Sequence, residues 1–330
     1  MTDPVFHVAF PTIDAPTGGG NQFLRALKGA FETRGLHDPT GTSADVILFN
    51  SYQNARAAIA LRRDNPKAIF VHRVDGPMRL YNKPDDPRDA LAIDANALIA
   101  DATVFQSQWC RSANRELGWP TDGPEAVIGN AADPAIFKPR PARACGPRLR
   151  LIATSWSANP NKGFDDYAWL DTNLDFSRIE MTFVGNAPVS FANIRVLPPL
   201  PSSGLAVELA AHDVFVTASR KDPCSNSLIE ALTVGLPAIA RADGGHPELV
   251  GTGGVLFRTA TEIPALIARV AAEYDAFRAA IRVPTIADIA GAYVAFAREL
   301  VAASAAGHLT PKRLGAFAAW RARWRFRGRS

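Results

Sequence analysis

The stretch that most limits the possible folds covers residues 218–232 and reads ASRKDPCSNSLIEAL. The apolar run before it, residues 214–217, is typical of a buried strand. Ser225 or Asn226 then suits the N-cap of a helix, because either side chain can accept a hydrogen bond from the first turn. A strand, an acid-containing loop and a helix in this order predict one unit of an α/β protein, whose helix start can face an anion.

Two interpretations of the acids in this stretch stay open on its residues alone. Glu230 would lie about one turn into the helix, where a carboxylate can accept hydrogen bonds from the vicinal hydroxyls of a sugar. Alternatively, Asp222 is a turn residue and Glu230 is a solvated helix acid.

The same alternation of strand and helix runs through the rest of the chain. Strand-like runs lie at 5–10, 46–49, 69–72 and 103–106 and, after a proline- and arginine-rich break at 138–147, at 149–153, 181–184, 214–217, 238–240 and 255–257. Helical patterns lie between them, at 21–34, 89–100, 164–170, 205–211, 227–233 and 263–277. This pattern predicts two α/β domains with parallel sheets, whose ligands bind beyond the carboxyl ends of the strands.

Composition excludes several classes of protein. The chain has 330 residues, 47% of them hydrophobic and 21% charged, which argues against disorder, collagen and coiled coil and allows about two domains. Its three cysteines form no C-x-x-C pair, so a disulfide scaffold or zinc ribbon is not indicated. We find no signal peptide pattern and no apolar run long enough for a bilayer, and we therefore expect a cytoplasmic protein.

The net charge of +4 comes from the end of the chain. After Glu299 there are seven bases and no acid, and without them the chain carries −3. A basic, nucleic-acid-binding body is therefore not supported, and no nucleic-acid partner is expected.

A second loop carries paired glycines. Residues 242–248 read ADGGHPE, where the glycines let the backbone approach a ligand closely. Pro247 and Glu248 suit the first turn of a further helix.

In this order, the motifs resemble those of retaining, family-4-type glycosyltransferases (glycosyl transferases group 1) with the GT-B fold. The matching residues are Asp222…Glu230, Gly235-Leu236-Pro237, Gly244-Gly245-His246-Pro247-Glu248 and Gly253-Gly254, with Asn161-Lys162-Gly163-Phe164, Val184-Gly185-Asn186 and residues 127–139 upstream. The glycines at 18–20, His72 and Phe105-Gln106-Ser107 match more loosely. The resemblance implies two Rossmann-like, doubly wound domains facing across a cleft: an acceptor-side domain at 1–140, a nucleotide-sugar-binding domain at 141–300, and a helix and basic aromatic tail at 301–330.

Three positions depart from the family pattern. Asp222 replaces the usual glutamate, Ser157 stands where an arginine is common, and residues 130–133 read NAAD instead of N-G-V-D. These changes leave donor identity and full activity open.

The resemblance also implies roles for individual residues. Glu230 would bind the donor ribose, Asp222 the transferred sugar, and His72 would lie beside the anomeric carbon, with its side chain or its backbone carbonyl facing the sugar. The diphosphate would be held by Lys162, by the amides around Ser225, Asn226 and Ser227, and by the loop Gly18, Gly19 and Gly20, with Arg220 or Lys221 as a further cation. We expect transfer without a metal or a cofactor, the nucleotide sugar being a co-substrate.

The tail at 312–330 mixes arginines with aromatic residues. Leu314, Phe317, Trp320 and Trp324 share a helical face, whereas the bases from Arg321 onward alternate as in an extended segment. It either binds an anionic membrane surface, such as the inner face of the cell membrane, or packs back on the first domain.

The leading hypothesis is a transferase that moves a sugar, with retention, from a nucleotide-diphosphate donor to a saccharide or lipid-linked acceptor in cell-surface polysaccharide or glycolipid assembly. The alternatives are a nucleotide-sugar epimerase, a phosphorylase of the same shape, and a GT-B protein that binds nucleotide sugar or membrane without turnover. No strong motif for the pyridoxal-phosphate lysine of such a phosphorylase is present.

Overall fold

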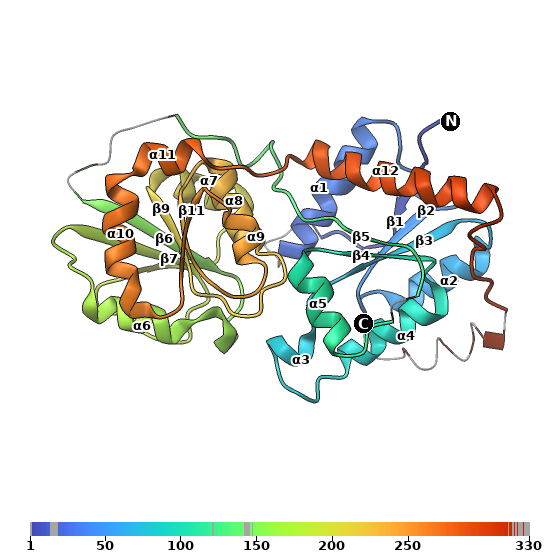
Figure 1. Cartoon of the computed structure of the whole chain (residues 1–330), viewed down its shortest axis with the longest axis horizontal. Coiled ribbons are helices and arrows are strands. Elements are labelled where there is room, and N and C mark those ends of the chain that lie inside the picture. Colours follow the sequence, from blue (N-terminus) through green and yellow to red (C-terminus); the bar gives the residue numbers. More distant parts are fainter. Residues whose placement is uncertain are drawn as a thin grey trace. The chain divides into compact units, whose positions relative to one another are not determined.

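The computed structural model describes residues 2–13, 19–120, 122–141, 146, 148–315, 317, 318, 320, 322 and 326. They form two compact units (Figure 1). The first unit comprises the described residues of Met1–Thr12, Leu24–Gly129 and Ile286–Ser330, and the second those of Ile13–Phe23 and Asn130–Thr285.

The first unit is built on a parallel sheet with the strand order β1-β2-β3-β4-β5. Its elements are β1 (Phe6–Val8), α1 (Gly19–Thr33), β2 (Val46–Asn50), α2 (Ala55–Asp64), β3 (Ile69–Val74), α3 (Met78–Tyr81), α4 (Arg88–Ile99), β4 (Ala102–Phe105), α5 (Gln108–Glu116), β5 (Glu125–Val127) and α12 (Ile286–Ala305).

Helices cover both faces of this sheet, which explains why its central strands are apolar at successive positions. On one face, Phe31 of α1 stacks on Phe6 at 4.2 Å and meets Tyr293 of α12 edge-on. On the other face lie α2 and α4 (Figure 1). Their apolar side chains form one cluster with Phe49 and Phe70.

The position of α12 differs from the expected domain boundaries. The range 141–300 placed it with the second domain, but it lies in the first unit. Its apolar side chains pack beside α1, and Arg298 Nε bonds Asp3 Oδ1 at 2.8 Å. Of the tail, Leu314, Ala322 and Phe326 also pack on the first unit, against the side covered by α2 and α4.

The second unit has a six-stranded parallel sheet with the order β11-β10-β9-β6-β7-β8. Its elements are β6 (Leu149–Ser155), the 3₁₀ turn η1 (Pro160–Lys162), α6 (Phe164–Asn173), β7 (Ile179–Gly185), β8 (Arg195–Leu197), α7 (Ser202–Ala211), β9 (Val214–Thr217), α8 (Asn226–Val234), β10 (Ala238–Arg241), α9 (His246–Val250), β11 (Gly254–Phe257), η2 (Ala260–Glu262), α10 (Ile263–Ala272) and α11 (Tyr274–Ala279).

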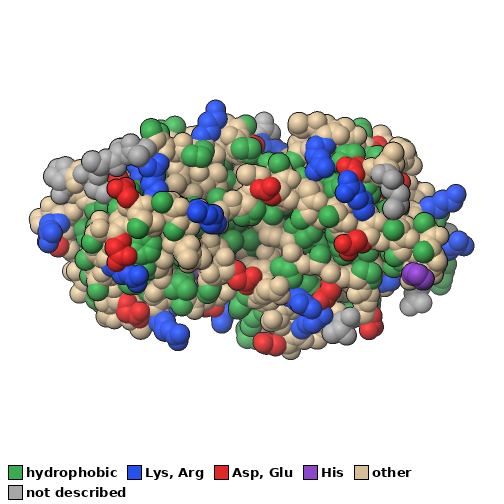
Figure 2. Space-filling model, turned by 45° about the horizontal axis from the view of Figure 1, so that its top comes forward, with side chains coloured by type: hydrophobic (Ala, Val, Ile, Leu, Met, Phe, Trp, Pro, Cys, Tyr) green, Lys and Arg blue, Asp and Glu red, His purple; other side chains and the backbone are tan. Residues whose placement is uncertain are grey.

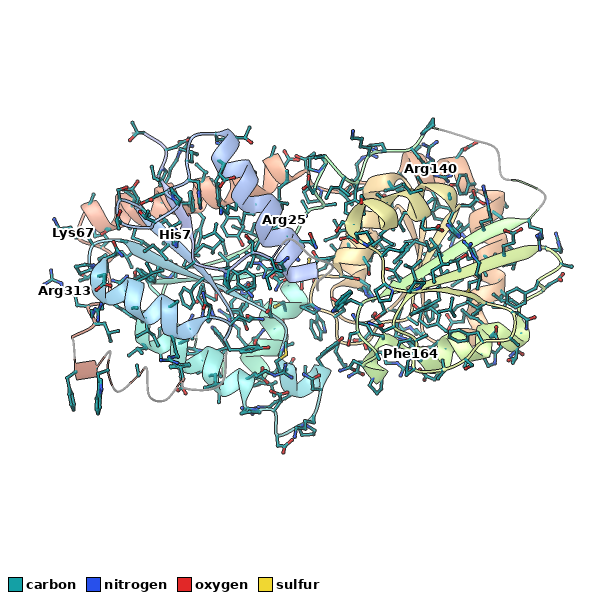
Figure 3. The ribbon with its side chains drawn as sticks, turned by 180° about the vertical axis from the view of Figure 1, so that it is seen from behind. His7, Arg25, Lys67, Arg140, Phe164 and Arg313 are labelled. Carbon is teal, nitrogen blue, oxygen red and sulfur yellow. The ribbon has the colours of Figure 1, made fainter. Side chains whose placement is uncertain are left out.

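The chain moves outward from β6 in both directions, so the strand order reverses between β6 and β9. Residues of α6, α10 and α11 fill the core on one face, and residues of α7 and α8 fill it on the other. In Figure 3, Phe164 and Arg140 mark two segments that belong to this unit. Such a doubly wound sheet binds ligands at the carboxyl ends of the two strands where the order reverses.

The expected fold class is confirmed in its central feature, two α/β domains with parallel sheets. Strands β5 and β8 and helices α2, α3 and α5 were not predicted, and the helix expected at 263–277 is interrupted at Glu273.

Among the described residues, no helix combines the length and the apolar character that crossing a membrane requires. On the face shown in Figure 2, the basic side chains are interspersed with acidic ones.

Candidate functional site

Lys162 and Asp222 meet where the strand order reverses. Lys162 ends the loop after β6, Asp222 lies in the loop after β9, and Lys162 Nζ is 3.1 Å from Asp222 Oδ2. The two loops are also joined by the backbone, since Arg220 N donates to Asn161 O at 2.7 Å. Gly163 permits this approach: it has φ +77°, and a Cβ there would lie 2.3 Å from Ala218 O. Two motifs that are 60 residues apart in the sequence therefore lie in contact in the folded second unit.

The paired-glycine loop packs directly on Asp222. Gly245 N donates to Asp222 O at 2.8 Å. Gly244 has φ +64°, and a Cβ there would lie 2.3 Å from the same oxygen. The GG-x-PE motif thus fixes the backbone that carries the acid.

Asp222 is buried but remains ionised. Burial opposes ionisation, yet the Lys162 ammonium and the nearby His246 ring bring the pKa of Asp222 below its ordinary value. His246 itself is buried, and burial lowers its pKa. Its Nδ1 donates to Arg241 O at 3.1 Å, and its Nε2 is buried without a partner among the described residues.

Glu230 differs from Asp222 in having no compensating charge. It lies on α8, buried, and its carboxyl group has no hydrogen-bond partner among the described residues. Burial alone raises the pKa of Glu230 to about 8. The side chain lines a pocket together with Gly19, Asn226 and Asp133. A protonated acid in a pocket is open to a ligand whose hydroxyls would favour the carboxylate.

The start of α8 lies against Gly19, the first residue of α1, which belongs to the second unit as α8 does. Ser225 is the N-cap residue of α8, and its Oγ is 3.2 Å from Ser227 Oγ. A Cβ on Gly19 would lie 2.6 Å from Asn226 Nδ2, so only glycine fits there. Gly20 has open space around its Cα, and Gly18 lies outside the described residues.

The two expected additional phosphate cations have acidic partners. Arg220 Nη2 lies 2.6 Å from Asp165 and 2.9 Å from Asp166, and Asp166 also pairs with Arg241. Lys221 Nζ lies 3.5 Å from Asp243. A phosphate would have to compete with these carboxylates for either side chain, so we leave both out of the site.

The structure corrects the expectation for His72. The residue is in the middle of β3 with no exposed surface, and its ring stacks on Phe49 at 4.2 Å. Nε2 bonds Ser51 O at 2.9 Å, and Nδ1 accepts from Asn96 Nδ2 at 3.1 Å. Burial lowers the pKa of His72 to about 3. A neutral ring with both nitrogens bonded in the core has no side-chain contact to offer a sugar, so the structure assigns the His72 ring a structural role. A role for the His72 backbone carbonyl stays a prediction.

Sequence reasoning missed the contribution of His246 to the charge balance at Asp222. The signal was present, because the ring belongs to the loop whose glycines approach Asp222. It also missed the Arg241 contact with Asp166, for which the sequence offers no signal. Among the described residues, no three His, Cys, Asp or Glu side chains are grouped as a metal site would require.

Comparison with known proteins finds a family model that matches the segment carrying Asp222 and Glu230. Residues 175–274 match the family model described as glycosyl transferases group 1. This range includes Asp222, Glu230 and the paired glycines, so the resemblance seen in these motifs is confirmed there. No curated protein sequence matches the chain.

Solved structures share the whole two-domain fold at low sequence identity. Sucrose-phosphate synthase from Thermosynechococcus elongatus is 16% identical, with a TM-score of 0.65 over 92% of this chain and 98% of that chain. Anabaena Alr3699/HepE in complex with UDP and glucose is 15% identical, with a TM-score of 0.64 over 92% and 100%. AviGT4, a glycosyltransferase involved in Avilamycin A biosynthesis, is 16% identical, with a TM-score of 0.61 over 91% and 98%. The fold is therefore that of GT-B glycosyltransferases.

Proposed function

We propose that this protein is a retaining glycosyltransferase that moves a sugar from a nucleotide-diphosphate donor to a saccharide or lipid-linked acceptor. The observation that carries the proposal is the meeting of Lys162, Asp222 and the paired-glycine loop at the reversal of strand order, with Glu230 on the helix that follows. Retention, and a place in cell-surface polysaccharide or glycolipid biosynthesis, rest on the resemblance of the motifs.

The nucleoside half of the donor would bind at α8. The pocket at Glu230 offers a carboxyl group without a competing partner, and vicinal ribose hydroxyls can donate two hydrogen bonds to it when it is ionised. The backbone N–H groups at Asn226 and Ser227 begin a helix, where an anion is stabilised. The diphosphate would therefore lie between this helix start and Lys162.

Lys162 would supply the positive charge that the reaction needs. Negative charge grows on the diphosphate as the glycosidic bond breaks, and a preorganised cation there is a large catalytic contribution. The Lys162 ammonium pairs with Asp222 at 3.1 Å. Binding of the donor would share Lys162 between the acid and the phosphates, while Asp222 accepts hydrogen bonds from hydroxyls of the transferred sugar. We propose that no metal ion takes part.

The test is release of nucleoside diphosphate from a panel of nucleotide sugars, with and without acceptor extracts. UDP-sugars are the first choice, because the similar Anabaena structures hold UDP and UDP-glucose. We expect acceptor-dependent release that persists in EDTA. Glu230→Ala should reduce kcat/KM by about a hundredfold or more, since a lost hydrogen-bond pair to a substrate costs several kcal/mol.

The matched control is Glu273→Ala, which removes an exposed glutamate of the same unit that pairs with Arg269. It should leave turnover within a factor of two of the parent. Equal kinetics for Glu230→Ala and Glu273→Ala would refute the site. Donor binding without release would identify a non-catalytic protein, and interconversion of the sugars would identify an epimerase.

A further inference from the structure

Trp156 is an exposed tryptophan at the carboxyl edge of the second unit's sheet. It directly follows Ser155, the last residue of β6. The loop that it begins contains Lys162 and ends at Phe164, the first residue of α6, which Figure 3 labels. Trp156 is 47% exposed, and no described residue stacks on its indole ring or hydrogen-bonds to it. A single exposed apolar residue is common on a protein surface, but this one lies at the edge where a parallel sheet binds its ligands.

The backbone on both sides of Trp156 is held in place. Asn186, which follows β7, donates from its N to Ser155 O at 3.1 Å and from its Nδ2 to Trp156 O at 2.6 Å. Ser155 Oγ donates to Ser157 O at 2.7 Å, which closes the turn around the tryptophan. Gly185 permits this contact, because it has φ +132° and an added Cβ would lie 1.8 Å from Ser155 O. A ligand that covers the ring therefore has little backbone to order.

The order of the strands places Trp156 on one side of the proposed donor. Along the sheet the order is β9, β6, β7, β8. Under the proposed function, on which this inference rests, the transferred sugar lies at Asp222 after β9 and the diphosphate lies at Lys162 after β6. The nucleoside is at the opposite end of the donor from the sugar, and so on the side of β7 and β8. Asn186 ties Trp156 to that side.

The pocket at Glu230 extends in the same direction. Ser202 lines it together with Glu230, and Ser202 begins α7, the helix that follows β8. A ribose at Glu230 would hold its base toward the carboxyl ends of β7 and β8. We infer that the Trp156 ring stacks on the nucleobase of the donor. Because every nucleobase offers a flat π face, the ring contributes affinity for the nucleoside without choosing between bases.

Nucleotide binding by variants of Trp156 tests this inference without acceptor or turnover. UDP is the first ligand, because the similar Anabaena structure holds UDP, and GDP and ADP follow. In isothermal titration calorimetry, Trp156→Ala should weaken UDP binding by about tenfold or more, because one stacking contact is lost. Trp156→Phe keeps a flat ring and should bind UDP within about threefold of the parent. Inorganic pyrophosphate has no base, and its affinity should be the same in Trp156→Ala and the parent.

Tryptophan fluorescence gives a second measurement. The second unit contains two tryptophans, Trp156 and Trp169. UDP should quench the emission of the parent, because a stacked base quenches indole, and Trp156→Phe should lose this quenching. Trp169→Phe is the matched control, since Trp169 packs against the apolar core of the unit. It should keep the quenching, and thermal unfolding should show that all variants are folded.

Four results would contradict the inference. Equal UDP affinity in Trp156→Ala and the parent would overturn it, and so would quenching that persists in Trp156→Phe. A pyrophosphate affinity that falls by the same factor as the UDP affinity would show that the substitution moved Lys162 instead. Unchanged UDP affinity with a raised KM for the acceptor would assign the ring to the acceptor. In contrast, a parent that binds none of UDP, GDP and ADP would overturn the proposed function itself.

Discussion

At the scale of single residues, Glu230 gives the sharpest prediction because its pKa lies far from its ordinary value. With a pKa of about 8 in the folded protein, the Glu230 side chain is mostly protonated at pH 7, whereas the same side chain is ionised in the unfolded chain. Donor ribose hydroxyls would favour the carboxylate, so binding should release up to one proton per nucleotide near pH 7, and affinity should rise with pH toward 8. Isothermal titration calorimetry of UDP binding in two buffers of different ionisation enthalpy measures the proton count.

Glu230→Gln is the control, because it keeps the shape of the side chain and removes the titration. The variant should release no proton. The free energy of unfolding of the parent should decrease between about pH 5 and pH 8, because the folded state holds an extra proton in that range. The free energy of unfolding of Glu230→Gln should not show this decrease. The same proton count in both proteins would contradict the role of Glu230.

The residues of the site differ in how far the sequence could predict them. Asp222, Glu230 and Lys162 belong to motifs with fixed spacing, and the structure brings Lys162 and Asp222 into contact. His72 also follows a matching pattern, but its partners Asn96 and Trp119 are distant in sequence. Whether a histidine is buried depends on such tertiary contacts, which no local pattern reports.

At the scale of elements, the site depends on loops held in contact by glycine. Gly244→Ala would force Cβ against Asp222 O and displace the acid. We expect it to lower the free energy of unfolding by about 3 kcal/mol and to reduce transfer activity strongly. Gly35→Ala is a matched control, since Gly35 has φ +66° but nothing within 4 Å of the added Cβ. It should lose only about 1 kcal/mol and keep its activity, as denaturant titration and donor turnover can show.

Elements were predictable where hydrophobic pattern and length agreed. The central strands of both sheets contain short apolar runs, such as those at 46–49, 69–71 and 214–216, and they occur where expected. The edge strands β5 and β8 have three residues each and no buried position, so they lack the signal that identified the others. Glu273 separates α10 from α11, although the apolar residues of both helices follow one helical period. Periodicity alone therefore does not predict the interruption.

At the scale of the whole molecule, the chain returns to the unit in which it began. Only the contacts of α12 reveal this, because its sequence is compatible with either unit. Five large side chains of the helix are buried: Ile286, Ile289, Tyr293, Val294 and Leu300. At about 1.5–3 kcal/mol for each, their burial contributes roughly 10 kcal/mol, which is comparable to the entire stability of a domain.

A chain ending at Thr285 should therefore lose the first unit while the second remains folded. Calorimetry should show one unfolding transition removed, and hydrogen exchange should show β1 to β4 unprotected. A chain ending at Gly315 is the control, because it keeps α12 and the contacts of Lys312 with Asp101. That chain should retain both transitions, with the first unit weakened by only a few kcal/mol from the loss of Phe326. If the shorter chain kept β1 to β4 protected, α12 would be an accessory of the first unit and not part of its core.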